Sequence, residues 1–211
     1  MRYLILDSQI NFYKEHGYIE FEDILSEEEC EILKNEIGYI LEKENITNLD
    51  PKEVYKRSRD LFRKSEKIKK FTLNRKFASI ASSLSGIGKL RIAFDQTFFF
   101  MKKNIFEKNG PITNINSLQG IVNFMLLKLD DSEPKKIGIF PKKKCGCVFI
   151  KSKTLLDFDD LFSNEEFFLI AYGDLKTVFN PNHKDPNVNF LKQFGYSYGD
   201  TLKDATHPIL C

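Results

Sequence analysis

Tryptophan is absent from the 211 residues, and histidine occurs only as His16, His183 and His207. Twenty phenylalanines supply most of the aromatic content, so the buried aromatic surface comes from rings that need no hydrogen-bond partner. No arginine follows Arg91 in the sequence. These shortages limit the sites that the chain can build from imidazole and guanidinium groups, above all in its C-terminal half.

Cysteine is also sparse, with Cys30, Cys145, Cys147 and Cys211 as the complete set. Their spacing gives no disulfide framework, and no second cysteine pair exists that could bind a soft metal together with Cys145 and Cys147. The first residues contain too short an apolar stretch for an export signal, and no apolar run is long enough to span a membrane. We therefore expect reduced thiols in a cytoplasmic protein that has no membrane partner.

The charge is nearly balanced, with a formal net charge of +2 that gives no indication of a polyanionic partner. Its distribution is uneven, because residues 7–50 are acidic whereas residues 52–76 carry eleven Lys or Arg. A basic segment of this kind could follow a phosphate backbone, but it lacks interleaved aromatic stacking platforms. We expect a solvated surface, or pairing with the acidic segment before it, and no nucleic-acid partner.

Helical patterns dominate residues 1–88. Ser26 and Glu29 form a capping-box signal that starts one helix. Asp50 before Pro51 predicts another helix, which the apolar spacing extends to about Lys70. Shorter patterns predict a helix capped by Ser8 and closed by Gly17, a strand at 18–21, and a helix at 76–84 that closes at Gly86.

After Gly86 the pattern changes to short strands separated by turn signals, at 89–102, 120–129, 147–151 and 167–172. A helical third followed by strands predicts an α+β protein. We expect a single domain over residues 1–211. Residues 1–88 would form a mainly helical cover, and residues 89–211 a β-sandwich core with a C-terminal extension.

Four motifs follow one another along the chain: 11–19 (NFYKEHGYI), 24–30 (ILSEEEC), 91–96 (RIAFDQ) leading to Lys102, and 126–131 (LLKLDD). In this order and spacing they resemble the phytanoyl-CoA-dioxygenase-like family over roughly the first two thirds of the chain. The resemblance implies a double-stranded β-helix (jelly-roll, cupin-like) barrel of about eight strands that binds Fe(II) and 2-oxoglutarate. In that family a lysine at the position of Lys102 can meet the co-substrate carboxylate.

The iron ligands that this resemblance implies are missing from their expected places. Such oxygenases hold iron with two histidines and one carboxylate, yet residues 109–120, where the family has His-x-Asp, contain neither. The later arginine that would pair with the co-substrate carboxylate is absent too. We therefore expect an oxygenase-fold protein without catalytic residues or cofactor, which binds a small molecule or a protein. Its cavity would be lined by Asp95, Gln96, Lys102, Gln119 and Asn123.

One His-x-Asp sequence remains, at His183 and Asp185, and His207 follows Asp185 by 22 residues. Alternate residues of a strand share a face, so His183 and Asp185 could bind one metal from the end of a strand. With His207 they are the metal ligands of an alternative hypothesis, an active Fe(II)/2-oxoglutarate-dependent dioxygenase. The surrounding Asn and Pro residues favour instead a loop with a solvated His183, in which Asp185 caps a short helix at 188–194. A third hypothesis is a nucleic-acid-binding protein that uses residues 52–76.

Overall fold

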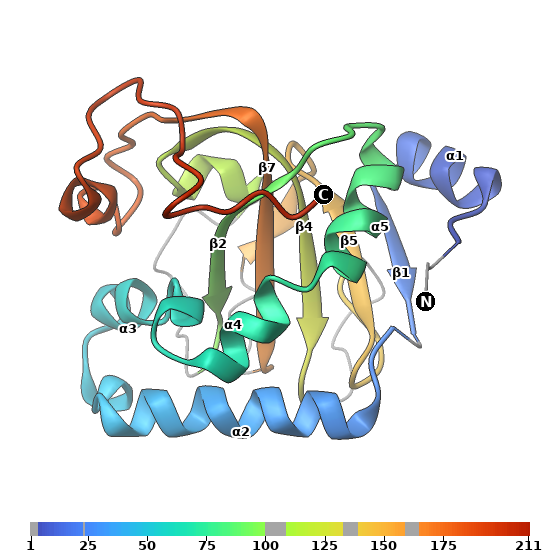
Figure 1. Ribbon diagram of the computed structural model, residues 1–211. Coiled ribbons are helices and arrows are strands. Elements are labelled where there is room, and N and C mark those ends of the chain that lie inside the picture. Colours follow the sequence, from blue (N-terminus) through green and yellow to red (C-terminus); the bar gives the residue numbers. More distant parts are fainter. Residues whose placement is uncertain (1–3, 23, 100–108, 133–138, 159–164) are drawn as a thin grey trace.

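A five-stranded antiparallel sheet forms the centre of the molecule, with helices across one of its faces (Figure 1). The computed structural model describes residues 4–22, 24–99, 109–132, 139–158 and 165–211. The strand order is β1 (Tyr18–Phe21), β5 (Cys147–Lys151), β4 (Leu118–Lys128), β7 (Phe167–Phe179) and β2 (Arg91–Thr97). A second sheet pairs β3 (Asn109–Gly110) with β6 (Leu156–Asp157). The predicted α+β class is confirmed.

Five α-helices and four short 3₁₀-helices are described. Two predicted helix starts are confirmed: Glu29 accepts from the Ser26 backbone N–H at 2.9 Å, and Asp50 accepts from that of Lys52 at 3.0 Å. Gly17 closes its helix as predicted, at a φ of 82°. The α-helices are α1 (Asp7–His16), α2 (Glu27–Lys43), α3 (Pro51–Arg57), α4 (Glu66–Thr72) and α5 (Arg75–Ser85), and the 3₁₀-helices are η1 (Ile46–Asn48), η2 (Leu61–Arg63), η3 (Ile112–Ile115) and η4 (Phe190–Phe194).

Two details of the helical prediction are wrong. Ser8 caps nothing, because α1 already begins at Asp7 and the Gln9 side chain accepts from the Leu6 N–H at 2.9 Å. The helix expected from Pro51 to Lys70 is instead divided into α3, η2 and α4. Between α3 and η2 the chain leaves the helix and pairs with the outer edge of β2, the last strand of the sheet.

Residues 58–60 run along this edge as a non-helical connection, with Asp60 in the left-handed region at a φ of 55°. The Thr97 N–H donates to the Ser58 carbonyl, and the Asp60 N–H donates to the Asp95 carbonyl, each at 2.9 Å. An isolated bridge joins Arg59 to Gln96 between them. An uncovered edge strand exposes a row of unpaired N–H and C=O groups. This segment pairs with such groups of β2, and a continuous helix through residues 58–60 would leave them unpaired.

The core lies between the sheet and the helices. All seven residues of β2 are buried, so this strand shows no alternation of buried and exposed side chains. Phe94 on β2 and Phe124 on β4 pack with ring centroids 6.4 Å apart. Each such buried ring contributes about 2–3 kcal/mol of hydrophobic stabilisation. No helix within the described ranges is long and apolar enough to cross a membrane.

Candidate functional site

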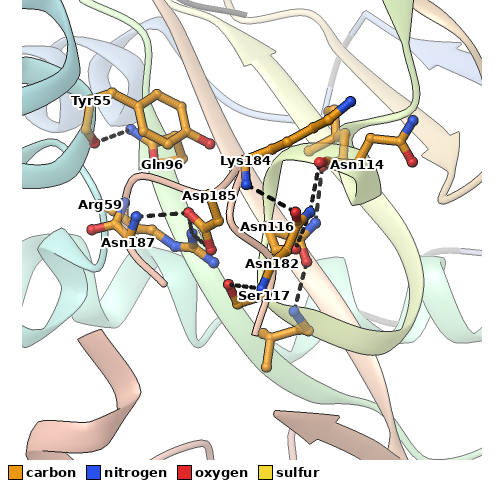
Figure 2. Close-up of polar contacts among 12 residues, drawn as sticks. Tyr55, Arg59, Gln96, Asn114, Asn116, Ser117, Asn182, Lys184, Asp185 and Asn187 are labelled. Carbon is orange, nitrogen blue, oxygen red and sulfur yellow. Dashed lines mark hydrogen bonds and ion pairs between the residues drawn. The ribbon is translucent and has the colours of Figure 1, made fainter. Parts of the chain in front are cut away.

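The loop that follows β7 is held against the entrance to β4 by amide side chains (Figure 2). The Nδ2 of Asn182 donates to the carbonyl oxygen of Asn114 at 2.7 Å and to that of Asn116 at 3.3 Å. The Asn182 backbone N–H donates to Ser117 Oγ at 3.2 Å. Residues 114–117 lie in the stretch where the family resemblance implies the first iron ligands. Here two backbone carbonyls and one hydroxyl of that stretch accept hydrogen bonds from Asn182 and join the two loops.

The carboxylate of the His-x-Asp sequence has another partner. Nη1 of Arg59 lies 3.3 Å from both carboxylate oxygens of Asp185, and Asp185 Oδ1 also accepts from the Asn187 N–H at 2.8 Å (Figure 2). Both side chains of the ion pair are buried, at 6% and 1% exposure. A buried charge needs a close counter-charge, so Asp185 is committed to Arg59 rather than free to bind a metal.

Arg59 is held on its other side by an aromatic ring. Its guanidinium carbon lies 3.9 Å from the ring centroid of Phe94, within the range of a cation–π contact. Burial lowers the pKa of Arg59, but Asp185 together with Tyr55 and Asp60 more than offsets that effect, so the pKa lies above its ordinary value. Arg59 is therefore a permanent buried cation that ties the edge segment 58–60 to the loop after β7.

His207 is buried behind a second arginine. Nη2 of Arg63 lies 3.2 Å from His207 Nε2, while Nδ1 lies 3.1 Å from the Tyr196 hydroxyl and 3.0 Å from the Thr206 hydroxyl. Arginine can only donate, so Nε2 accepts and the ring proton sits on Nδ1. Burial, with Arg63 and two further arginines, lowers the pKa of His207 to about 3. Both ring nitrogens are thus occupied in a neutral imidazole.

The two other histidines are placed differently. His183 is exposed, as the loop hypothesis predicted. His16 lies on α1, where its ring stacks on Phe12 with centroids 4.1 Å apart. Within the described part of the chain, no group of three His, Cys, Asp or Glu side chains is positioned to hold a metal ion. Because every histidine of the sequence is described, the residues present do not fit a centre of two histidines and a carboxylate.

The short-helix part of the loop hypothesis needs correction. The helical turn after Asp185 is η4, whose N-cap residue is Asn189, so Asp185 does not cap it. Asp185 instead accepts from the N–H of Asn187 within the loop itself. The predicted loop character is otherwise confirmed, since residues 180–189 form neither helix nor strand.

Asp95, a predicted cavity residue, fastens the helical layer to the sheet. Its carboxylate accepts from the N–H groups of Leu61 at 2.7 Å and Phe62 at 2.9 Å, and from the Thr72 hydroxyl at 3.1 Å. Burial raises its pKa to about 7, to which the charge of Asp60 adds, while the three donors act in the opposite direction. The carboxylate therefore starts η2 and holds α4.

The remaining predicted cavity residues do not share one location. Gln96 donates to the carbonyl oxygens of Tyr55 and Thr97, and Asn123 donates to that of Ala81 on α5 at 3.0 Å. Gln119 is exposed, and its side chain lies 3.4 Å from Asn180 Nδ2. Lys102 lies outside the described residues. The structure thus gives Gln96 and Asn123 protein partners in the helical layer, and their role in ligand binding stays a prediction.

Sequence reasoning does not identify Arg59 as the partner of Asp185, or Asn182 as the centre of an amide network. Arg59 stands in a run of basic residues that carries no local signal for burial. The Asn and Pro residues around His183 predict a loop but not what that loop contacts. Both interactions join segments far apart in the sequence, where residue spacing gives no information.

No family model matches the sequence, and no curated protein matches it significantly. Solved structures do match. The non-heme alpha-ketoglutarate-dependent carbocyclase SnoK from nogalamycin biosynthesis superposes with a TM-score of 0.72 at 15% identity, covering 98% of this chain and 97% of SnoK. The epimerase SnoN, solved in complex with Fe³⁺, alpha-ketoglutarate and nogalamycin RO, gives a TM-score of 0.69 at 14% identity, covering 97% and 98%. CT296 from Chlamydia trachomatis gives 0.52 at 14% identity, covering 82% and 97%. The chain therefore has the fold of non-heme oxygenases.

Proposed function

We propose that this chain is a divergent oxygenase-fold protein that binds a small molecule or a protein partner and performs no iron chemistry. We further propose that its sheets form a double-stranded β-helix of the phytanoyl-CoA-dioxygenase-like type. The similarity in fold to SnoK and SnoN supports the architecture. The four free cysteines are consistent with a cytoplasmic location.

The observation that carries this proposal is that the candidate ligands Asp185 and His207 already have protein partners. Asp185 is paired with Arg59, while His207 uses both ring nitrogens in hydrogen bonds. A fold persists readily when its site is lost, because packing and chemistry depend on different residues. Here the buried ion pair and the Asn182 amide contacts stabilise loops that would otherwise have to present metal ligands.

The test is an anaerobic titration with Fe(II), and separately with Mn(II), followed by calorimetry. We expect no saturable binding at one ion per chain. With 2-oxoglutarate and oxygen added, we expect no succinate above that of a protein-free control. Stoichiometric binding that is lost in His183→Ala but kept in His16→Ala would overturn the proposal and favour the dioxygenase alternative. His16→Ala is the matched control, because His16 lies on α1 and packs against Phe12.

A further inference from the structure

A groove of about 620 Å³ lies between the segment that leaves α3 and the residues around η4, which face each other at the left of Figure 1. This volume is in the range of sites that bind small molecules. One acidic side chain, Asp60, lines it. Five basic side chains also line the groove: Lys56, Arg57, Arg59, Arg63 and Lys64.

The positive charge of this groove is only partly compensated. Arg59 pairs with Asp185, Arg63 with Asp60, and Lys64 with Glu44. Lys56 and Arg57 share one carboxylate, that of Glu53. The nitrogen of Lys56 lies 2.5 Å from Glu53 and Nε of Arg57 lies 3.9 Å from it. Arg57, about half-exposed, is therefore left with the weakest pairing of the five, and the groove attracts an anion.

Two residues that line the groove each have a buried side-chain atom with no hydrogen-bond partner among the described residues. One atom is Nδ2 of Asn187, whose residue is only 8% exposed, and the other is Oδ1 of Asp60. The backbone N–H and C=O of Asn187 are satisfied, by Asp185 and Phe190, so its side-chain amide alone lacks a partner. Buried polar groups in native proteins are almost always paired, so these two side chains have a donor and an acceptor to offer once they turn towards the groove. A ligand that offers anionic oxygens and a hydroxyl group would satisfy both.

An aromatic wall completes the groove. The rings of Phe190 and Phe194 lie edge to face with centroids 5.5 Å apart, and both residues line the cavity. The guanidinium carbon of Arg63 lies 4.7 Å from the Phe194 ring centroid. Aromatic and guanidinium planes of this kind accept a flat ring by stacking.

The basic charge does not continue as a track beyond the groove. On α4, Lys67 pairs with Glu36 of the acidic helix α2 at 2.8 Å, and Lys69 pairs with Glu66 at 3.0 Å. A nucleic acid is held by successive phosphate contacts along a surface, which these ion pairs interrupt. The observations favour a compact ligand over a polymer.

We propose that this groove binds a small phosphate ester of the nucleoside monophosphate class. Arg57, Lys56 and the Asn187 amide take the phosphate, Asp60 accepts from a sugar hydroxyl, and the flat base packs on Phe190. This inference does not rest on the proposed function above, since it holds whether or not the chain binds iron.

The test is calorimetric titration of the full chain with adenosine 5′-monophosphate, ribose 5-phosphate, adenosine and a short single-stranded RNA. We expect saturable binding of the monophosphate and weaker binding of the two fragments. Arg57→Gln and Asn187→Leu each remove a donor to the phosphate and are expected to weaken monophosphate binding by about tenfold or more. Lys52→Gln is the matched control, because it removes the same charge from an exposed position on α3 outside the groove. It should leave binding unchanged.

Phe190→Leu separates the two parts of the ligand, since it should weaken the monophosphate but not ribose 5-phosphate. If Asn187→Leu fails to fold, Arg57→Gln alone decides, because its side chain is half-exposed. The proposal is overturned if the monophosphate shows no saturable binding, or if Arg57→Gln and Lys52→Gln bind it equally. It is also overturned if only RNA binds, with a steep dependence on salt, which would assign these cations to a nucleic-acid surface.

Discussion

Arg59 and Asp185 stand 126 residues apart in the sequence and form a buried ion pair with Nη1 3.3 Å from each carboxylate oxygen. The pair joins the segment along the edge of β2 to the loop after β7. It therefore ties the break between α3 and η2 to the only His-x-Asp sequence of the chain. One interaction thus joins two segments that are distant in the sequence and occupies the carboxylate of a candidate metal ligand.

Removing one partner of this pair should cost far more than removing both. Asp185→Asn keeps an acceptor for the Asn187 N–H but leaves the Arg59 charge buried without a counter-charge. We expect the free energy of unfolding to fall by about 3–5 kcal/mol. The double variant with Arg59→Met keeps neither charge of the pair, so its loss should be smaller than the sum of the single losses by about 2 kcal/mol or more. Denaturant unfolding of the four proteins measures both quantities.

The partly exposed pair of Lys56 and Glu53 provides the comparison for that cycle. Lys56→Met should change the free energy of unfolding by less than about 1 kcal/mol, because solvent screens a pair at this level of exposure. Strictly additive losses in the Arg59 and Asp185 cycle would show that the two buried residues do not depend on each other.

Acidification should destabilise the protein through His207. Its pKa is about 3 in the folded chain and near its ordinary value of 6.5 in the unfolded chain, so the unfolded state binds the extra proton between these values. The stabilising contribution is complete above pH 6.5 and is lost as the pH falls towards 3. His207→Gln lacks the titrating group, so the wild type should lose stability relative to this variant by at most about 1.4 kcal/mol per pH unit.

The measurement is the free energy of unfolding of the wild type and of His207→Gln between pH 4 and pH 7. Asp95 has a raised pKa, but it is present in both proteins and drops out of the difference. The control is His16→Gln, which replaces an exposed histidine, and its free energy of unfolding should follow that of the wild type over this pH range. A difference between wild type and His207→Gln that is independent of pH would show that His207 is not held neutral.

Asp95 should act as the start signal of η2. In Asp95→Asn the side-chain NH₂ group must face either the Leu61 N–H or the Phe62 N–H, so one buried N–H loses its acceptor. We expect the free energy of unfolding to fall by about 1–3 kcal/mol. Hydrogen exchange at the amides of Leu61 and Phe62 should accelerate. Thr72→Val removes only the third donor while keeping the shape of the side chain, so it should cost about 1 kcal/mol and leave those two amides protected. Unchanged protection of both amides in Asp95→Asn would contradict this role.

The sequence predicts those features of the fold whose interacting residues lie close together along the chain. The Ser26 capping box and the Gly17 helix end involve residues within a few positions of each other, and both are confirmed. The break after Arg57 could not be predicted, because the groups that stabilise it belong to Asp95 and Gln96 on β2. The apolar spacing continues through this break and by itself predicts one continuous helix. Pairing with the edge of β2 interrupts that helix.

The candidate site shows the same division. The Asn and Pro residues around His183 predicted a loop with an exposed histidine, and both features are present. The partners of that loop, Arg59 and the carbonyl groups of Asn114 and Asn116, come from other parts of the chain. The shortage of histidine is visible from composition alone, whereas the partners of each histidine depend on the fold. The groove between α3 and η4 has no sequence signature, because its two walls are brought together only by the fold.

The Asn182 amide offers a last and local test of how the loop after β7 is held. Its Nδ2 donates to two carbonyl groups and its Oδ1 accepts from the Lys184 N–H at 3.0 Å, so Asn182→Ala removes three hydrogen bonds at once. We expect a loss of about 1–2 kcal/mol in the free energy of unfolding, and faster proteolytic cleavage within residues 180–189. Asn180→Ala is the matched control, since that exposed side chain makes one long contact with Gln119. Equal cleavage rates in the two variants would mean that the Arg59 and Asp185 ion pair alone positions the loop.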